Sequence, residues 1–258
     1  MYREHTLRTR IETHRKYSER PVDFFAWVVS HIPWRGDEHV LDVGCGNGAY
    51  FPYYRNKGAR ITALDLSPEM LTAARRRNVT GVRLIQAAAT AIPFTDNTFD
   101  VVFANHVLFF VEDIERALRE CHRVLKPGGV FAAATNTADS QQALYALHAR
   151  AVHRAGRMPR PLPHARFPLE EGATWVRNVF GHAEVHRHEN AFLFPSVEAA
   201  MRYYLSGPIN EVVGPPLTPE ERQIIIEEVR RRIAYIIERE GVWRVPKSAG
   251  VILARKGA

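Results

Sequence analysis

Short apolar segments alternate with helix-like segments in the first half of the chain. The apolar segments are rich in Val, Ile, Leu, Phe or Ala and lack strict alternation, which is typical of strands buried on both faces of a sheet. The pattern predicts five such strands, at His39–Gly44, Ala59–Asp65, Val82–Ala87, Phe99–Asn105 and Gly129–Thr135. Strands that alternate with helices imply right-handed crossovers and a parallel sheet with helices on both faces.

Local signals indicate where the intervening helices begin and end. Ser67-Pro68-Glu69 combines an N-cap serine, a proline at the first helical position and an acid in the first turn. Glu112–Leu125 carries apolar residues at helical spacing, and Lys126-Pro127-Gly128-Gly129 ends it. The fold class predicted for this half is therefore α/β.

The regular alternation of short apolar and helix-like segments ends after residue 136. The expected elements there are helices at Gln141–Ala155, Leu169–Val179, Val197–Leu205 and Thr218–Glu240, and strands at Ala183–Phe194 and Gly250–Lys256. Thr218 and Glu221 form a capping-box pattern with proline at the first helical position. The segment from Arg157 to His164 has three prolines, which predicts an extended loop.

Composition narrows the class of protein. The chain has 258 residues, 46% of them apolar and 24% charged, as in an ordinary soluble globular protein of one large domain. Its two cysteines, Cys45 and Cys121, are too few for a disulfide framework or a four-cysteine zinc site. With no signal-peptide pattern and no apolar run of about 18 residues, we expect a cytoplasmic protein without a membrane span.

The net charge of +7 is concentrated in two segments. Residues 1–20 carry six basic and three acidic side chains, and residues 150–166 carry five arginines and no acid, so the remaining residues sum to −1. The second run has three interpretations: an anion-binding lid for a phosphorylated or carboxylated substrate, a contact to nucleic-acid phosphates, or a solvated face. Residues 150–166 lack aromatics that would stack on bases, which weakens the nucleic-acid interpretation.

The segment Asp42-Val43-Gly44-Cys45-Gly46-Asn47-Gly48 carries the clearest chemical signal. Glycines at alternate positions after a strand let the backbone turn sharply and approach a ligand closely. The lysine of a phosphate-binding loop is absent, but a dinucleotide loop remains a rival, since Gly44, Gly46 and Ala49 satisfy its permissive form. Asp65 ends the second strand, where an acid can accept hydrogen bonds from ribose hydroxyls.

These residues, together with Ile92–Val102 and Leu125–Gly129, resemble the class I S-adenosylmethionine-dependent methyltransferases. The nearest group is that of the small-molecule enzymes typified by ubiquinone/menaquinone biosynthesis methyltransferases. The resemblance is strong over residues 39–136 and implies a Rossmann-like, doubly wound, seven-stranded sheet with an antiparallel last strand.

The resemblance also implies roles for individual residues. The loop of Asp42, Gly44, Cys45, Gly46 and Gly48 would hold the methionine end of S-adenosylmethionine, and Asp65 its ribose. Leu66 and Met70 would pack near the adenosine, and Asn105 and His106 would face the amino-acid part and the methyl group. Tyr17 would lie on a segment that folds over the cofactor; the alternative is a core aromatic of a cap helix with Phe24, Phe25 and Trp27.

One position departs from the family pattern. Ala88 stands where similar proteins have an acid that contacts the adenine amino group, so backbone groups of Ala88 and Ala89 would read the adenine edge instead. Losing one such hydrogen bond costs about 1 kcal/mol, which predicts a several-fold weaker affinity.

The candidate for a general base is His106, directly after the fourth strand; the alternative is a packing or cofactor-lining role. A cysteine at the loop position of Cys45 is common in the family that the chain resembles, so Cys45 is not expected to be a reactive thiol. Cys121 is expected in the core. The histidines of 148–164 and 182–188 fit no ligand spacing, so no metal is expected.

We therefore expect a single methyltransferase domain over residues 1–258, acting on a small molecule, either neutral or anionic. It would comprise a helical cap at 1–35, a cofactor-binding core at 36–136, cap helices at 137–245 with one core strand near 183–194, and a final strand within 246–258. The alternatives are an RNA methyltransferase that uses basic patches 1–20 and 150–166, and a non-catalytic S-adenosylmethionine-binding protein, suggested by Ala88.

Overall fold

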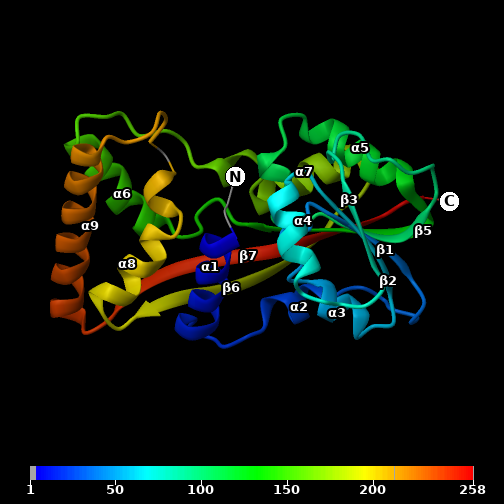
Figure 1. Ribbon diagram of the computed structural model, residues 1–258, viewed down its shortest axis with the longest axis horizontal. Helices are drawn as coiled ribbons and strands as arrows, with labels where there is room; N and C mark the ends of the chain where they lie inside the picture. Colours follow the sequence, from blue (N-terminus) through cyan, green and yellow to red (C-terminus); the bar gives the residue numbers. More distant parts are fainter. Residues whose placement is uncertain (1–3, 212, 258) are drawn as a thin grey trace. The chain divides into compact units, whose positions relative to one another are not determined.

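The computed structural model describes residues 4–211 and 213–257; the ends of the predicted cap at 1–3 and of the predicted final segment at 258 lie outside this range. The strands form one seven-stranded sheet in the order β3-β2-β1-β4-β5-β7-β6 (Figure 1). They are β1 (His39–Val43), β2 (Arg60–Asp65), β3 (Val82–Gln86), β4 (Phe99–Phe103), β5 (Leu125–Asn136), β6 (Glu184–Phe194) and β7 (Trp243–Arg255). Strands β1 to β5 pair in parallel and β7 runs antiparallel to β5, so the predicted fold class is confirmed.

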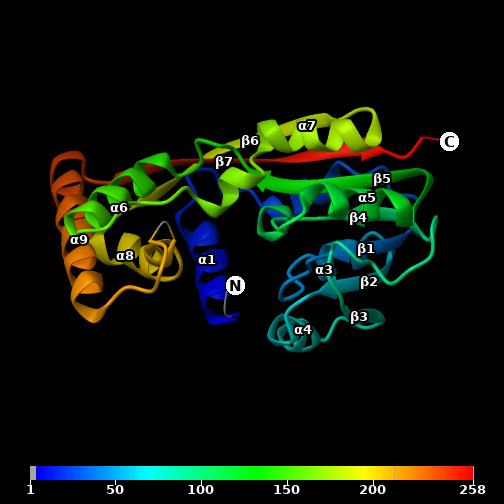
Figure 2. The same ribbon diagram turned by 90° about the horizontal axis from the view of Figure 1, so that it is seen from above.

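Helices cover both faces of the part of the sheet formed by β1 to β5 (Figures 1 and 2). On one face α2 (Phe24–Ser30), α3 (Phe51–Arg55) and α4 (Pro68–Arg75) pack against residues such as Val40, and on the other α5 (Ile114–Val124) and α7 (Leu169–Phe180) pack against residues such as Leu41. Successive residues of β1 thus enter different cores, which is why the strand sequence is continuously apolar.

Two strands are longer than the sequence pattern predicts. β5 begins at Leu125, because the Pro-Gly-Gly segment that ends α5 is a bulge within the strand: Phe99 pairs with Leu125, but Val101 pairs with Val130. β7 begins at Trp243 rather than Gly250; Pro246 interrupts the apolar pattern, and its carbonyl accepts a hydrogen bond from the Gln141 N–H at 2.9 Å.

The chain divides into two compact units. Unit 1 comprises residues 1–22, 139–166 and 188–248, and unit 2 comprises 23–138, 167–187 and 249–258. Helix α2, which we expected within the N-terminal cap, groups with the sheet in unit 2.

Unit 1 has a core of its own, formed by residues 188–194 of β6, residues 243–248 of β7 and four helices. These are α1 (Glu4–Tyr17), α6 (Gln142–Arg154), α8 (Val197–Leu205) and α9 (Pro219–Glu240). The aromatic rings of Phe192, Phe194 and Tyr203 are fully buried at its centre. The predicted capping box of α9 is present, with Thr218 and Glu221 bonded reciprocally. None of the helices in the described range is both long and apolar enough to cross a membrane.

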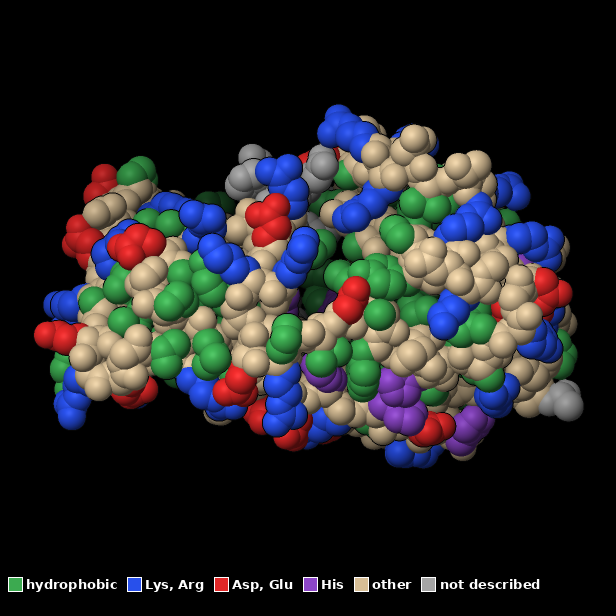
Figure 3. All heavy atoms as spheres, turned by 90° about the horizontal axis from the view of Figure 1, so that it is seen from below, with side chains coloured by type: hydrophobic (Ala, Val, Ile, Leu, Met, Phe, Trp, Pro, Cys, Tyr) green, Lys and Arg blue, Asp and Glu red, His purple; other side chains and the backbone are tan. Residues whose placement is uncertain are grey.

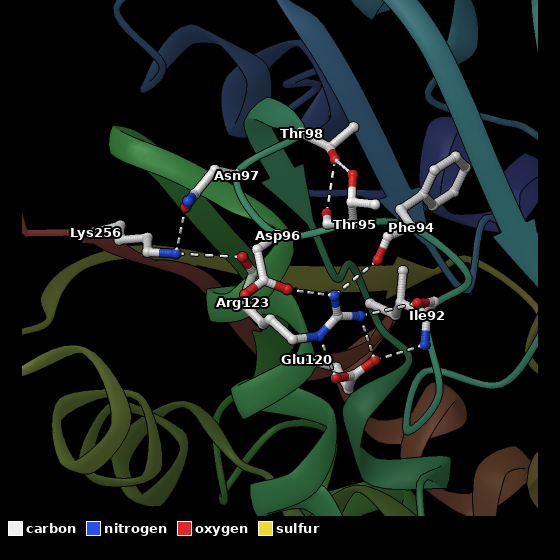
Figure 4. Close-up of polar contacts among 9 residues, drawn as sticks. All are labelled: Ile92, Phe94, Thr95, Asp96, Asn97, Thr98, Glu120, Arg123 and Lys256. Atoms are coloured by element: carbon white, nitrogen blue, oxygen red, sulfur yellow. Dashed lines mark hydrogen bonds and ion pairs between the residues drawn. The ribbon is translucent and has the colours of Figure 1, made fainter.

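A network around Arg123 fixes the loop between β3 and β4 in unit 2 (Figure 4). The Arg123 guanidinium donates two hydrogen bonds to Glu120, one to Asp96 and two to the carbonyls of Phe94 and Ile92, at 2.7–2.9 Å. Glu120 also accepts the Ile92 N–H at 2.7 Å. One side chain of α5 therefore forms hydrogen bonds with backbone carbonyls of a loop that is not paired with a strand.

Replacing Arg123 with methionine should lower the free energy of unfolding by about 2–4 kcal/mol, because Glu120 and two carbonyls lose charged donors. Urea denaturation measures the change. Arg119→Met is the matched control: this arginine lies on the same helix, is 67% exposed and pairs with Glu115 alone among the residues that the structure describes, so we expect an effect within about 0.5 kcal/mol. Equal losses in the two variants would show that the network does not stabilise the loop.

Candidate functional site

The glycine loop after β1 is held by the neighbouring strand. The N–H groups of Gly44 and Cys45 both donate to the Leu64 carbonyl, at 2.8 and 3.0 Å. Gly44 has φ +68°, and a Cβ added to it would lie 2.2 Å from Cγ2 of Val107. Gly44 thus needs to be glycine both for its left-handed backbone and for the close packing of the segment after β4.

Asp65, at the end of β2, completes the loop. Its Oδ2 accepts the Gly46 N–H at 2.9 Å, and its Oδ1 accepts the Ser67 N–H at 2.9 Å. Each carboxylate oxygen retains capacity for a further donor. The carboxylate therefore joins the glycine loop to the start of α4 and presents acceptors at the carboxyl end of the strand.

Three buried oxygen atoms in and beside the loop have no hydrogen-bond partner within the described residues: Asp42 Oδ2, Asn47 Oδ1 and the Tyr50 hydroxyl. All three side chains are at most 7% exposed. Burial, reinforced by the nearby Asp65 charge, raises the pKa of Asp42 well above its usual range. Unsatisfied buried polar atoms are rare in folded proteins, so three within nine residues indicate groups that await a partner; the Asn47 oxygen can only accept, whereas the Tyr50 hydroxyl can both accept and donate.

Asn47 and Tyr50 were not among the residues predicted from the sequence. Asn47 stands between two glycines, where the glycine pattern itself specifies no side chain, and Tyr50 follows the loop as an aromatic residue like those of an ordinary core. Only the inventory of hydrogen-bond partners distinguishes them.

The chain after β4 carries Asn105 and His106. The buried Asn105 side chain donates to the Tyr54 hydroxyl at 3.2 Å and accepts the Ala134 N–H at 3.1 Å. The half-buried His106 has φ +53°, its N–H donates to the Ala134 carbonyl at 2.8 Å, and its ring lies 5.8 Å from that of Phe24. A non-glycine residue in this conformation is uncommon and occurs preferentially at functional sites.

The other predicted contact residues of unit 2 differ in exposure. Leu66, directly after Asp65, is 59% exposed, whereas Met70 is buried in the first turn of α4. Ala88 and Ala89 are half-buried in the loop after β3. The edge formed by the carboxyl ends of β1, β2 and β3 thus carries both polar acceptors and apolar surface.

Neither cysteine has the environment of a nucleophile. Burial is the main reason that the pKa of Cys45 lies well above its usual range, and burial raises the pKa of Cys121 to about 12. Both side chains therefore remain neutral thiols at neutral pH.

Tyr17 belongs to unit 1. Its ring packs on Phe194 with centroids 5.7 Å apart, whereas Phe24, Phe25 and Trp27 belong to unit 2. Tyr17 therefore packs against the core of unit 1 as a half-buried aromatic, as the alternative expected, but with partners other than Phe24, Phe25 and Trp27.

Two arginines of the basic run 150–166 are engaged within unit 1. Arg157 forms two hydrogen bonds to Glu221, at 2.6 and 2.7 Å, and donates to the carbonyls of Pro215 and Pro216. Arg154 pairs with the largely buried Glu228 at 3.5 Å. These two side chains hold the extended loop and α6 against the start and middle of α9, which supports a structural role for this part of the run.

Within the described residues, no three His, Cys, Asp or Glu side chains gather as metal ligands do. The site at the carboxyl edge therefore offers acceptors for hydrogen-bond donors and surface for an apolar group.

Comparison with known proteins identifies the class of domain. Residues 41–133 match the family model described as a methyltransferase domain. The chain is 37% identical over 129 residues to a malonyl-[acyl-carrier protein] O-methyltransferase of Enterobacter lignolyticus, covering 50% of each protein. It is 39% identical over 107 residues to the protein of the same name from Serratia marcescens, covering 42% of each. The chain thus spans about half the length of the curated relatives it matches.

The fold similarity extends further than the sequence similarity. The crystal structure of a putative methyltransferase from Bacillus halodurans superposes with a TM-score of 0.64 at 20% identity, covering 91% of this chain and 99% of that one. Together with the glycine loop, Asp65 and the sheet order, these matches show that residues 41–133 form a methyltransferase domain.

Proposed function

We propose that the protein transfers a methyl group from S-adenosylmethionine to a small-molecule acceptor. The observation that carries this proposal is the set of three unpaired buried oxygens of Asp42, Asn47 and Tyr50 beside the glycine loop. An ammonium group has three N–H donors and no acceptor, so the amino-acid end of S-adenosylmethionine suits this set. A bound cation would also favour the charged form of Asp42 and so oppose the effect of burial on its pKa.

The remaining contacts follow the carboxyl edge of the sheet. Asp65 would accept hydrogen bonds from the ribose hydroxyls, and Leu66 and Met70 would pack against the adenosine. Backbone groups of Ala88 and Ala89 would read the adenine edge. We place Asn105 and His106 beside the amino-acid part and the methyl group.

S-adenosylmethionine supplies a methyl carbon on a sulfonium, which an acceptor attacks in line. The protein's main contribution is to hold the acceptor atom in that line and to exclude water. If the acceptor is a hydroxyl or an acidic carbon, His106 would remove its proton. A carboxylate is ionised at neutral pH and needs no base, so His106 would then only position the acceptor.

The acceptor class comes from the relatives. They are named as O-methyltransferases of malonyl groups on an acyl-carrier protein. We infer that this chain methylates a carboxylate oxygen of a short acyl group carried as a thioester.

Methyl transfer can be tested with labelled S-adenosylmethionine and a panel of acceptors, comprising malonyl thioesters, free dicarboxylates and a transfer RNA pool. We expect label on the malonyl thioester alone. Label on RNA would favour the RNA alternative, and cofactor binding without transfer to any acceptor would favour a non-catalytic binding protein.

Replacing Asp65 with alanine should weaken binding of S-adenosylmethionine by about 100-fold, because two charge-assisted hydrogen bonds to the ribose, each worth about 1.5 kcal/mol, are lost. Titration calorimetry measures the affinity. Asp37→Ala is the control, because this acid is exposed in a loop before β1. If Asp65→Ala bound the cofactor as well as the unchanged protein does, the ribose assignment would be wrong.

A further inference from the structure

Five basic side chains gather at one edge of unit 2 and serve none of the roles described above. They are exposed, and we call them the basic edge: Arg55, Lys57, Arg60, Arg75 and Arg83. The sequence pattern did not single them out, because Asp65 and Glu69 lie in the same stretch and reduce its net charge.

The topology brings the five residues together. Arg60 and Arg83 lie at the amino-terminal ends of neighbouring parallel strands, where Thr62 pairs with Arg83. Arg55 and Lys57 lie between the end of α3 and the start of β2, and Arg75 ends α4.

Contacts confirm that these segments meet. The Arg55 guanidinium donates to the carbonyl of Thr80, just before β3, and a Cβ added to Gly81 would lie 2.6 Å from it. The charges of Arg60 and Arg83 both act on His39 and contribute to its lowered pKa, although burial is the main cause. Arg55, Arg60 and Arg83 therefore meet at the amino ends of β2 and β3, with Lys57 in the loop that leads into β2 and Arg75 at the end of α4. Lys and Arg side chains are frequent on the face of unit 2 that Figure 3 shows.

No carboxylate pairs with any of these five side chains in the part of the chain that the structure describes. This contrasts with the rest of the protein, where arginines of α1, α5, α6 and α9 form ion pairs. Asp65 and Glu69 lie at the opposite end of β2 and in the first turn of α4. Asp37 is the exposed acid on this side, since the loop at Gly36 packs against Gly58. The charge of Asp100, which also acts on His39, is balanced by Arg35 and Lys126, so the five basic side chains outnumber the exposed acid Asp37.

The surroundings of the basic edge restrict the kind of partner. The large exposed apolar side chains of the described residues include none at this edge, and the nearest in sequence, Leu66, lies at the carboxyl end of β2. A protein interface would need aromatic or aliphatic anchors, and single-stranded nucleic acid would need stacking rings. The basic side chains come from helix ends and strand starts, not from a helix face or ribbon that could enter the groove of a duplex.

We propose that the basic edge adsorbs the protein to an anionic phospholipid surface through contacts between its guanidinium and ammonium groups and lipid phosphates. Each Lys or Arg near such a surface contributes about 1 kcal/mol, so the attraction is reversible and sensitive to salt. The carboxyl ends of the strands, with the proposed cofactor site, remain at the other edge of the sheet. The proposal is independent of the proposed methyl transfer.

Sedimentation with vesicles tests the proposal on the full chain. The vesicles contain phosphatidylcholine alone or with 30% phosphatidylglycerol, at 50 and 500 mM salt. We expect binding to the anionic vesicles at low salt only. The triple variant Lys57→Gln, Arg60→Gln, Arg75→Gln should bind them about 100-fold more weakly, since three charges are removed.

The matched control removes three exposed, ion-paired arginines elsewhere: Arg8→Gln, Arg119→Gln, Arg230→Gln. It has the same net charge as the first variant and should bind within about threefold of the unchanged protein. Thermal melts establish that both variants fold. Equal losses in both variants, absence of binding by the unchanged protein, or binding to a 20-base-pair duplex in preference to the vesicles would each overturn the proposal.

Discussion

Replacing Gly44 with alanine is expected to lower the affinity for S-adenosylmethionine by more than tenfold and to destabilise the fold by about 2–4 kcal/mol. The added Cβ would lie 2.2 Å from Val107 Cγ2, on a backbone with φ +68°. Overpacking costs about 1–3 kcal/mol and the left-handed conformation about 1–2 kcal/mol for a residue with a Cβ. Relief of the clash moves the loop that holds Asp42 and Asn47, and with it the proposed ammonium site.

Gly128→Ala separates the effect of the left-handed backbone from the effect of the clash with Val107. Gly128 has φ +74°, but its added Cβ would meet no atom within 4 Å. This variant should lose about 1 kcal/mol of stability and keep its cofactor affinity. Calorimetric titration and urea denaturation of both variants give the comparison. If Gly44→Ala behaves like Gly128→Ala, the contact with Val107 does not position the loop.

Replacing Lys247 with methionine is expected to stabilise the protein at neutral pH. Lys247 is 8% exposed, and its ammonium lies 2.9 Å from His14 Nδ1, 2.6 Å from Ser18 Oγ and 4.1 Å from the centroid of the Phe192 ring. Burial lowers the pKa of Lys247 from 10.5 to about 7. The unfolded chain therefore binds more protons than the folded chain between pH 7 and 10.5, so this group makes stability rise with pH in that range.

The cost of burying the Lys247 charge is thus largest at and below pH 7 and disappears toward pH 10.5. A pKa change of this size corresponds to an upper limit of ~4–5 kcal/mol, and lost hydrogen bonds reduce the expected gain to about 1–3 kcal/mol at pH 7. Urea denaturation of Lys247→Met and the unchanged protein at pH 6–10 measures the difference. Lys57→Met, at an exposed position, should show no such trend. A gain that stays constant with pH would show that the pKa of Lys247 is not lowered.

The strands and most helices were predictable because their patterns are local. Strand β2 reads as a short apolar segment that includes Thr62, and Ser67-Pro68 marks the start of α4 independently of any distant contact. The first half of β7 was missed because Pro246 ends the apolar run, whereas the fold satisfies this segment through a carbonyl that accepts from Gln141. Its pairing depends on a residue more than 100 positions away.

The candidate site was only partly predictable, because some of its features depend on contacts between segments that are distant in the sequence. The glycines, Asp42 and Asp65 stand in a recognisable order, but Asn47 and Tyr50 become candidates only when the fold leaves their oxygens without donors. The contact of Val107 with Gly44 likewise joins segments from two strands. The basic edge emerges only when β2 and β3 pair and acids in the same stretch lie at the other end.

The central claim is that the glycine loop binds S-adenosylmethionine through acceptors left unpaired by the protein. Titration calorimetry of the full chain with S-adenosylmethionine, its demethylated product S-adenosylhomocysteine and NAD tests it most directly. We predict that both adenosyl compounds bind at one site, that Tyr50→Phe and Asn47→Ala weaken both, and that NAD does not bind. Binding of NAD, or binding of neither adenosyl compound, would contradict the claim.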